Sequence, residues 1–343
     1  MSKKPAFVSD YMEGAHPAIL NKLIETNLEK TSGYGTDEYT AEAKDKIRAA
    51  CNAPDAEVYF LVGGTQTNAT IIDAILKPYQ GVVAANTGHI SIHEAGAIES
   101  GGHKVLEIPH VNGKLRESDV RAYLEKYWAD PSCEHIVMPG MLYISQPTEY
   151  GTLYSLDELK ALSALCREYN MALYLDGARL AYALGCPSND VTLPDIAELC
   201  DAFYIGGTKC GALFGEAVLT KKNLGPHLFT IIKQHGALLA KGRLSGIQFG
   251  VLFEDDLYLK LGKHAIDEVC RIKNALKEKG YRFAIDSPTN QTFVVLDKEQ
   301  LERLSAQVDM ECWEKLEGGG AVMRIATSWA TTDEDVEKLI EIL

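Results

Sequence analysis

Residues 171–179 read Met-Ala-Leu-Tyr-Leu-Asp-Gly-Ala-Arg, an apolar run that ends on Asp176 and is followed by Gly177 and Arg179. A short apolar run with a polar residue at its end is typical of a buried β-strand. The residues before it, 155–169, have the apolar spacing of an amphipathic helix. The stretch therefore predicts a helix that leads into a strand, which is the repeating unit of α/β folds.

The same alternation of strand and helix continues on both sides of this stretch. Further strand-like runs lie at residues 58–62, 82–85, 202–205 and 217–219. After the first of them comes a helical run that Pro78 ends, and a second helix is expected from about Ser91. Strands separated by helices indicate a mostly parallel sheet that is covered on both faces.

The pattern changes in the last third of the chain. A long helical stretch is expected over residues 244–279. It is followed by strands at 281–285, 292–296 and 322–327 and by helices at 298–306 and 333–343. We therefore predict an α/β fold with two domains: a large domain over residues 1–250 that includes the N-terminal segment, and a small α+β domain over residues 251–343. A length of 343 residues fits two domains of about 150 residues each.

Composition and charge argue against several classes of protein. The chain has 34 Lys and Arg against 48 Asp and Glu, and this acidic balance disfavours a nucleic-acid partner, because phosphate binding needs clustered cations. Its apolar runs are shorter than the roughly 18 residues of a membrane helix, and Met1–Asp10 lacks the apolar core of a secretory signal. The eight cysteines form no Cys-x-x-Cys pair, so we expect free thiols in a reducing compartment, the cytoplasm.

Two charged residues lie at or just after the ends of predicted strands. Lys209 lies between glycines after the strand at 202–205, and Asp176 closes the strand at 172–176. Ligands gather at the carboxyl ends of parallel strands, so both side chains are expected in one crevice. The pair suits pyridoxal phosphate (PLP), because a desolvated lysine amine can bond its aldehyde and a carboxylate can keep its pyridine nitrogen protonated. The alternatives are an exposed lysine in a glycine-rich loop and a structural Asp176–Arg179 ion pair.

A glycine-rich turn separates a predicted strand from a predicted helix, with the sequence Gly63-Gly64-Thr65-Gln66-Thr67-Asn68. Free backbone N–H groups at a helix N-terminus bind phosphate, and a threonine hydroxyl adds a donor. The turn has neither the Gly-Lys-Ser/Thr of a Walker A loop nor the Gly-x-Gly-x-x-Gly pattern. Simple N-capping of the helix by Thr65 is the alternative.

Two histidines, His89 and His93, lie four residues apart beside Glu94. On a helix that spacing places both imidazoles on one face, which permits a metal site, but the order is not the His-Glu-x-x-His of metalloproteases and no third ligand is apparent. His89 also follows a predicted strand, where its ring can stack on a flat cofactor and act as an acid or base. A partly buried histidine without a function is the third interpretation.

Arg179 and Arg324 are candidates for binding a substrate carboxylate. The planar guanidinium matches a carboxylate with two parallel hydrogen bonds. Arg324 lies inside the predicted strand at 322–327, where a charge needs a partner or a ligand. Structural salt bridges are the alternative for both arginines.

Taken in order, these segments resemble the threonine aldolase family. The resembling motifs are Val8-Ser9-Asp10, Gly33-Tyr34-Gly35-Thr36-Asp37, Gly64-Thr65-Gln66-Thr67-Asn68, His89-Ile90 with Glu94 and Gly96, Asp176-Gly177-Ala178-Arg179, Thr208-Lys209, and Arg324. They span most of the chain, and Asp-Gly-Ala-Arg is the most specific of them. The resemblance implies a large PLP-dependent transferase-like domain with a mainly parallel sheet, and a small C-terminal α+β domain.

The resemblance also implies roles for individual residues. The catalytic residues would be Lys209, His89 and Asp176. The cofactor would contact Gly64, Thr65, Gln66, His89, Asp176, Arg179, Thr208 and Lys209. The substrate would contact Ser9, Tyr34, Arg179 and Arg324, and no metal is implied. The reaction would be cleavage of a β-hydroxy-α-amino acid, such as threonine or allo-threonine, to glycine and an aldehyde by a homo-oligomer, a dimer or a tetramer.

Two segments depart from the family pattern. Where the family has a Thr-His-Asn segment, residues 145–151 read Ser-Gln-Pro-Thr-Glu-Tyr-Gly, so the second active-site histidine is absent. Proton removal then rests on His89, on a water that it orients, or on Glu149. The family's Met-Arg-Gln is also altered, and Arg243 is one candidate to replace the lost arginine.

The reaction type remains open from residue identities alone. With the same cofactor, β-elimination, racemisation or transamination of a small amino acid are alternatives. A metal-dependent hydrolase that uses His89 and His93 is a further alternative, but it leaves Lys209 and Asp176 without a role.

Overall fold

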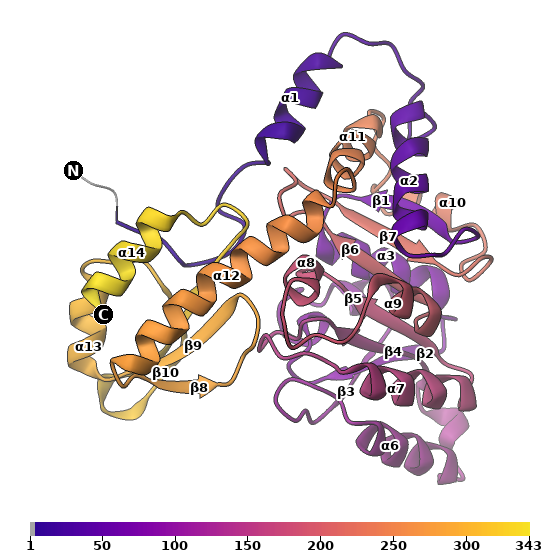
Figure 1. The fold of residues 1–343 in the computed structure, drawn as a ribbon. Helices are drawn as coiled ribbons and strands as arrows, with labels where there is room; N and C mark the ends of the chain where they lie inside the picture. Colours follow the sequence, from indigo (N-terminus) through magenta and orange to yellow (C-terminus); the bar gives the residue numbers. More distant parts are fainter. Residues whose placement is uncertain (1–3) are drawn as a thin grey trace.

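In the computed structural model, which describes residues 4–343, the chain forms two lobes joined by a long helix (Figure 1). The strands of the larger lobe are β1 (Glu57–Leu61), β2 (Gln80–Ala85), β3 (Val105–Ile108), β4 (Met138–Ser145), β5 (Ala172–Asp176), β6 (Ala202–Gly206) and β7 (Glu216–Thr220). They form a seven-stranded sheet in the order β1-β7-β6-β5-β4-β2-β3. The smaller lobe holds β8 (Arg282–Ile285), β9 (Gln291–Leu296), β10 (Glu311–Lys315) and β11 (Ala321–Ala326), in the order β10-β11-β9-β8.

The large sheet is mostly parallel. Strands β2 to β6 run in one direction, whereas β7 is antiparallel to both of its neighbours, β1 and β6. The predicted α/β fold with a mainly parallel sheet and a smaller C-terminal α+β part is confirmed. Strands β3, β4 and β10 escaped prediction; in β4, Pro139 and Gly140 hide the strand because both residues are rare inside central strands.

Helices surround the large sheet and cover one side of the small one. The helices of the larger lobe are α1 (Pro17–Glu25), α2 (Glu38–Ala50), α3 (Gly64–Ile75), α4 (His89–Ile92), α5 (Ala97–Ser100), α6 (Glu117–Ala129), α7 (Leu156–Glu168), α8 (Leu180–Leu184), α9 (Leu193–Leu199), α10 (Leu228–Gln234) and α11 (Arg243–Leu252). The long α12 (Leu257–Glu278) connects the lobes, and α13 (Lys298–Ser305) and α14 (Asp333–Ile342) belong to the smaller one (Figure 1). Short 3-10 turns lie at Cys133–His135 and Glu317–Gly319.

Two helix predictions are wrong in detail. The stretch 244–279 is divided into α11 and α12, because Asp255 and Asp256 between them adopt positive φ values of 48° and 56°. The helix expected from Ser91 is reduced to the single turns α4 and α5, which Ala95 and Gly96 separate with positive φ values of 50° and 71°. A left-handed residue cannot continue a right-handed helix.

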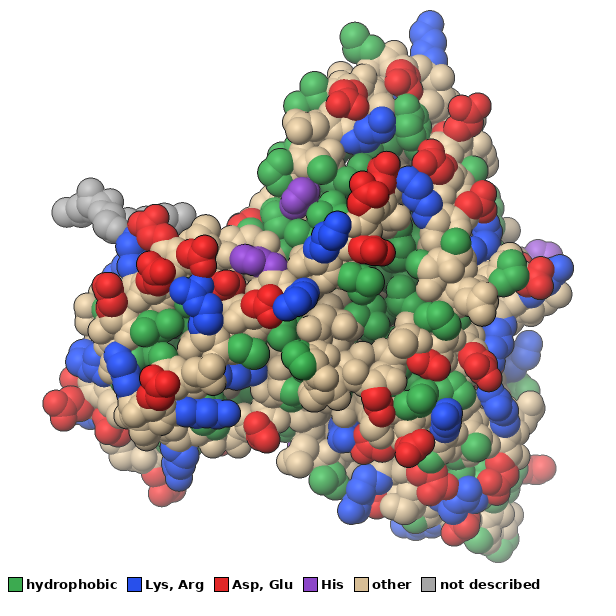
Figure 2. Space-filling view, in the orientation of Figure 1, with side chains coloured by type: hydrophobic (Ala, Val, Ile, Leu, Met, Phe, Trp, Pro, Cys, Tyr) green, Lys and Arg blue, Asp and Glu red, His purple; other side chains and the backbone are tan. Residues whose placement is uncertain are grey.

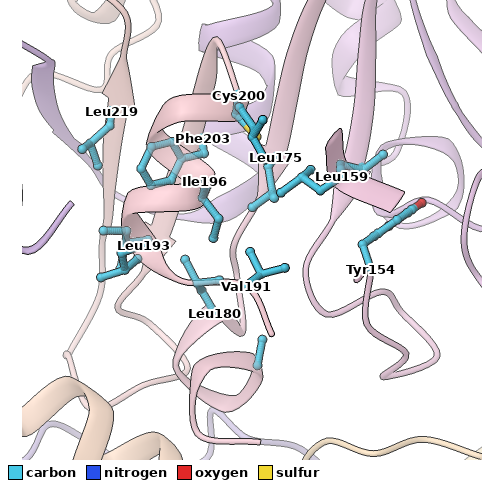
Figure 3. Packing of buried hydrophobic residues seen from close by; sticks show 14 of the residues in the cluster. Tyr154, Leu159, Leu175, Leu180, Val191, Leu193, Ile196, Cys200, Phe203 and Leu219 are labelled. Atoms are coloured by element: carbon cyan, nitrogen blue, oxygen red, sulfur yellow. The ribbon is translucent and has the colours of Figure 1, made fainter. Parts of the chain in front are cut away.

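The two faces of the large sheet bury different side chains with a period of two residues. Leu173, Leu175 and Phe203 pack into one apolar cluster with α7, α8 and α9, whereas Tyr174 and Tyr204 point to the opposite face, toward α3. Figure 3 shows the first cluster, with Phe203 against the helix that carries Leu193 and Ile196. Strands buried on both faces read as continuous apolar runs, which is why they were visible in the sequence.

The N-terminal segment packs on the smaller lobe. Ala6 pairs with Asp309 in a parallel bridge, and Phe7 is buried among side chains of α12, β9 and β11. The boundary near residue 250 between a large and a small domain stays a prediction. Within residues 4–343, no helix combines the length and the apolar character needed to cross a bilayer.

Candidate active site

The carboxyl ends of β4, β5 and β6 lie along one edge of the large sheet. Ser145 at the end of β4 pairs in register with Asp176 at the end of β5. Because β7 is antiparallel, its first residue, Glu216, lies at the same edge, opposite Gly206 of β6. A cavity of about 250 Å³ opens there. It is lined by Tyr11, Gly64, Thr65, His89, Ser145, Pro147, Thr148, Glu149, Asp176, Ala178, Arg179, Tyr204, Thr208, Lys209 and Glu216.

Asp176 is held ionised by four hydrogen-bond donors. Oδ1 accepts from the Tyr204 hydroxyl at 2.5 Å and the Ala178 N–H at 3.0 Å, and Oδ2 accepts from the Tyr143 hydroxyl at 2.6 Å and the Asn68 amide at 3.1 Å. Burial alone would raise the pKa of this carboxyl, but the nearby His89 imidazole and the hydroxyl donors outweigh burial and hold the pKa below its usual range. No ion pair links Asp176 to Arg179 among the described residues, so the structural alternative for Asp176 does not hold.

Lys209 follows β6 in a tight turn and is half-buried in the same cavity. Its carbonyl oxygen accepts a hydrogen bond from the Tyr182 hydroxyl at 2.5 Å, and its Nζ lies 5.9 Å from the centre of the Tyr11 ring. Burial and the charge of Arg179 lower the pKa of the Lys209 amine. A lowered pKa increases the neutral, nucleophilic fraction of an amine.

The glycine turn before α3 leaves its N–H groups free. Gly63 is the N-cap residue and no side chain caps the helix, so the alternative in which Thr65 acts as the N-cap is wrong. Gly64 and Thr65 line the cavity, whereas Gln66 does not; its Oε1 instead accepts from the Val62 N–H at 3.3 Å. The N-terminus of α3 therefore offers an anion site to the cavity through Gly64 and Thr65.

His89 is oriented by a buried carboxylate. Its Nδ1 lies 2.7 Å from Oε1 of Glu94, whose side chain is inaccessible to solvent. The same oxygen accepts from the Asn68 amide at 2.7 Å, and this amide also donates to Asp176. Since Glu94 accepts at Nδ1, that nitrogen carries the hydrogen and Nε2 is left as the acceptor.

Both candidate arginines already hold a carboxylate. Arg179 donates from Nε and Nη2 to the two oxygens of Asp10, at 2.7 and 3.0 Å. Arg324 pairs with Glu311 and donates to Gln291 Oε1 at 2.9 Å and to the Val8 carbonyl at 3.1 Å. Arg179 lines the cavity and Arg324 does not.

Three further predicted residues lie outside the cavity lining. Ser9 is buried. Tyr34 lines a separate pocket together with Phe229, and Lys233 Nζ lies 4.6 Å from the centre of the Tyr34 ring. Arg243 donates to the carbonyls of Thr26 and Glu29 in the segment after α1, which gives it a structural role there. The structure thus brings together Lys209, Asp176, His89, Arg179, Thr208 and the α3 turn, but not Ser9, Tyr34, Gln66, Arg243 or Arg324.

The segment that lacks the family histidine supplies a different group. Gln146 is buried and uses its amide on the Tyr154 backbone, accepting at 2.9 Å and donating at 3.2 Å. Glu149 lines the cavity. Its Oε1 accepts a hydrogen bond from the backbone N–H of His89 at 2.9 Å and another from the Ser145 hydroxyl at 2.8 Å. Burial raises the pKa of the Glu149 carboxyl.

Several site residues had no assigned role in the sequence analysis. They are Asn68, Tyr143 and Tyr204 around Asp176, Asp10 on Arg179, and Glu216 beside Lys209. Asn68, Asp10 and Glu94 stand inside the quoted family motifs, which was an available signal for them. Tyr204 was identified only as a strand residue, and Tyr143 lies in β4, which was not predicted. Within residues 4–343, no three His, Cys, Asp or Glu side chains cluster with metal-binding geometry.

Comparison with known proteins identifies the family. A family model described as beta-eliminating lyase matches residues 6–303. The low specificity L-threonine aldolase of Pseudomonas aeruginosa is 31% identical over 98% of this chain and 95% of its own length. The chain belongs to the beta-eliminating lyase family. The resemblance to threonine aldolases is thereby confirmed, and so is the PLP-dependent lyase class.

Solved structures agree with this family. A Leishmania major threonine aldolase is 44% identical to this lyase and superimposes with a TM-score of 0.95 over 98% of both chains. A variant of Thermus thermophilus aspartate aminotransferase is 17% identical, with a TM-score of 0.73 over 99% of this chain and 90% of its own. At that identity the second comparison shows the fold alone, which is that of PLP-dependent transferases.

The cavity of this lyase fits PLP by the chemistry of its side chains. An amine with a lowered pKa, a buried ionised carboxylate and an uncapped helix N-terminus line one space. These are the groups that an aldehyde, a protonated pyridine nitrogen and a phosphate require.

Proposed function

We propose that the chain cleaves the Cα–Cβ bond of a β-hydroxy-α-amino acid of the threonine or allo-threonine type, releasing glycine and an aldehyde. The observation that carries the proposal is the placement of Lys209, Asp176 and His89 around one cavity in a chain with threonine aldolase relatives. When bound, PLP supplies an electron sink that accepts the electron pair of the broken bond.

Five groups would hold the cofactor. Lys209 would form a covalent bond with the aldehyde of PLP. Asp176 would contact the nitrogen of the pyridine ring, and the His89 imidazole would stack on the face of that ring. The Thr208 hydroxyl and the N–H groups of the α3 turn at Gly64 and Thr65 would bind its phosphate. Gln66 would act through the turn, because its side chain braces the backbone of Val62 and does not line the cavity.

Arg179 is the substrate-carboxylate residue that the cavity supports best. Asp10 takes the Nε hydrogen and one hydrogen of Nη2, so both hydrogens of Nη1 and the second hydrogen of Nη2 are left for the substrate. Asp10 fixes the plane of the guanidinium and thereby the direction of approach. Arg324 and Ser9 would join this contact only if Arg324 exchanged Glu311 for the substrate carboxylate.

His89 is proposed to take the proton of the β-hydroxyl as the Cα–Cβ bond breaks, directly or through a water. Glu94 holds Nδ1, which leaves Nε2 to accept that proton and stabilises the imidazolium that forms. Glu149 is the alternative proton acceptor, because its carboxyl group lines the same cavity and accepts a hydrogen bond from the backbone N–H of His89.

Oligomeric state and location are part of the same proposal. Leu20, Ile24 and Leu28 are exposed by 40, 74 and 91% on the arm that α1 forms, and Figure 2 shows hydrophobic side chains on this arm and below it. Burial of such a surface favours a homo-oligomer, a dimer or tetramer, in which Tyr34 would contact the substrate of a neighbouring copy. All eight cysteines are free thiols in the described chain, which supports a cytoplasmic location.

A product assay tests the reaction type. The full chain is incubated with PLP and either L-threonine or L-allo-threonine, and all products are quantified. Glycine and acetaldehyde in equal amounts support the proposal. A keto acid with ammonia would show elimination, and a keto acid with an aminated cofactor would show transamination. Inversion at Cα alone, which gives D-allo-threonine from L-threonine or D-threonine from L-allo-threonine, would show racemisation. Each of these as the main product overturns the aldol cleavage.

A further inference from the structure

Glu216 is a buried carboxyl group without a cation in contact. The residue is 3% exposed and its side chain lines the same cavity as Thr208 and Lys209. Its hydrogen-bond partners in the described chain are the Gly207 N–H, 3.1 Å from Oε2, and the Thr208 hydroxyl, 2.8 Å from Oε1. Neither partner is charged, and a buried carboxylate without a contacting cation favours its neutral form.

The surroundings of Glu216 agree with that expectation. Burial raises the pKa of Glu216 to about 8, although Thr208, Lys209 and the Gly207 N–H oppose the rise. The titratable groups around it are Lys209, Cys210, Asp176, Tyr174, Tyr204 and Tyr258. Lys209 is the only cation among these, and burial lowers its own pKa. Burial and the absence of a contacting cation therefore favour the neutral acid form of Glu216.

The protonation of Glu216 decides where the Thr208 hydroxyl points. A hydroxyl has one hydrogen and two acceptor positions. One position of Thr208 Oγ1 is taken by the Gly215 N–H at 3.0 Å. If Glu216 is ionised, the Thr208 hydrogen goes to its carboxylate. If Glu216 is protonated, the acid donates to Thr208 instead, both acceptor positions are filled, and the hydroxyl hydrogen is free to turn into the cavity.

We propose that Glu216 is a positioning residue that acts as a neutral acid and turns the Thr208 hydroxyl toward the phosphate of the cofactor. The inference rests on the proposed function, because it takes the α3 turn at Gly64 and Thr65, which lines the cavity with Thr208, as the phosphate site. Ionisation of Glu216 withdraws this donor and adds a negative charge near the phosphate. Cofactor affinity should therefore fall as the pH rises through about 8.

The Glu216→Gln variant is a close mimic of the neutral acid. Its amide oxygen accepts from the Gly207 N–H, its NH₂ donates to Thr208 Oγ1, and it does not ionise. The dissociation constant of PLP is measured at pH 7 and pH 9.5 on the full-length, cofactor-free wild type and variant. Between pH 7 and pH 9.5, we expect the PLP affinity of the wild type to fall by about tenfold or more in excess of any fall in Glu216→Gln. That factor is the effect of one hydrogen bond to a charged group.

Pyridoxal, which lacks the phosphate, is the matched control ligand. Its affinity depends on the Lys209 amine, whose pKa the Glu216 charge also raises, but not on the Thr208 donor. The difference in pH dependence between wild type and Glu216→Gln should therefore be smaller with pyridoxal than with PLP. The Thr208→Val variant keeps the shape of the side chain but lacks the hydroxyl, so PLP should bind to it more weakly at pH 7. The pH dependence of PLP affinity should also be smaller in this variant than in the wild type.

Each outcome decides one claim. Equal pH dependence of PLP affinity in wild type and Glu216→Gln overturns the role of Glu216 but leaves the proposed function intact, provided that PLP binds. A difference that is as large with pyridoxal as with PLP also overturns it, because the effect then runs through Lys209. If wild type binds no PLP at either pH, both the inference and the proposed function fail.

Discussion

Replacing Asp176 with Asn tests the centre of the site while keeping its shape. The carboxylate accepts from Tyr204 at 2.5 Å and Tyr143 at 2.6 Å on opposite oxygens, and from Asn68 and the Ala178 N–H at about 3 Å. An asparagine accepts on one side only, so its NH₂ group would face at least one of these donors. The variant also lacks the negative charge that keeps a bound pyridine nitrogen protonated.

The expected loss follows from these contacts. A hydrogen bond to a charged group contributes about 1.5 to 3 kcal/mol. Losing the contact to the ring nitrogen and mispairing one tyrosine hydroxyl should raise the barrier by about 3 to 5 kcal/mol. That corresponds to a rate loss of about 10² to 10⁴.

The assay measures kcat for aldol cleavage at saturating PLP, with bound cofactor quantified in the same samples. Tyr143→Phe is the matched control, since it removes one donor to Oδ2 but keeps the charge, and we expect it to lose about tenfold, the lower end of the range for a hydrogen bond to a charged group. Near-wild-type turnover of Asp176→Asn with cofactor bound would refute the role assigned to the carboxylate.

The remaining predictions concern the groups around Asp176. Lys209→Ala should lose nearly all turnover, and borohydride should no longer attach PLP covalently; attachment at another lysine of the wild type contradicts the assignment. Arg179→Lys should raise KM with PLP retained, whereas unchanged constants in Arg324→Lys would make Arg324 a structural partner of Glu311. His89→Asn should lose about a hundredfold in rate and the acidic limb of the pH profile; wild-type cleavage by His89→Phe would contradict its role as the base.

The part of the site that could be predicted is the part that parallel strands create. Asp176 ends one apolar run and Lys209 lies a short turn beyond the end of another, and the carboxyl ends of parallel strands meet at one edge. Two local patterns in the sequence therefore predict a contact between residues far apart in the chain. The same reasoning places His89 after β2 and Thr65 after β1 at the cavity.

Glu216 could not be predicted in this way because its strand runs in the opposite direction. An antiparallel strand brings its first residue, not its last, to the edge where the carboxyl ends meet. An apolar run does not reveal its own direction, so the sequence 216–220 shows a strand but not which end faces the cavity. The partners of the arginines are hidden for a related reason, since Asp10 and Arg179 are 169 residues apart.

The segment 145–151 shows that a missing family residue need not leave the site without an acid or base. Gln146 lies in the region of the absent histidine in the sequence, yet its amide is occupied by the Tyr154 backbone and it does not line the cavity. Three residues later, Glu149 does line the cavity. One of its oxygens accepts a hydrogen bond from the backbone N–H of His89, and burial raises the pKa of its carboxyl group. A carboxyl group can accept and release a proton, which a glutamine amide cannot. Glu149 is therefore a second candidate acid or base beside His89, on a residue that a position-by-position comparison passes over.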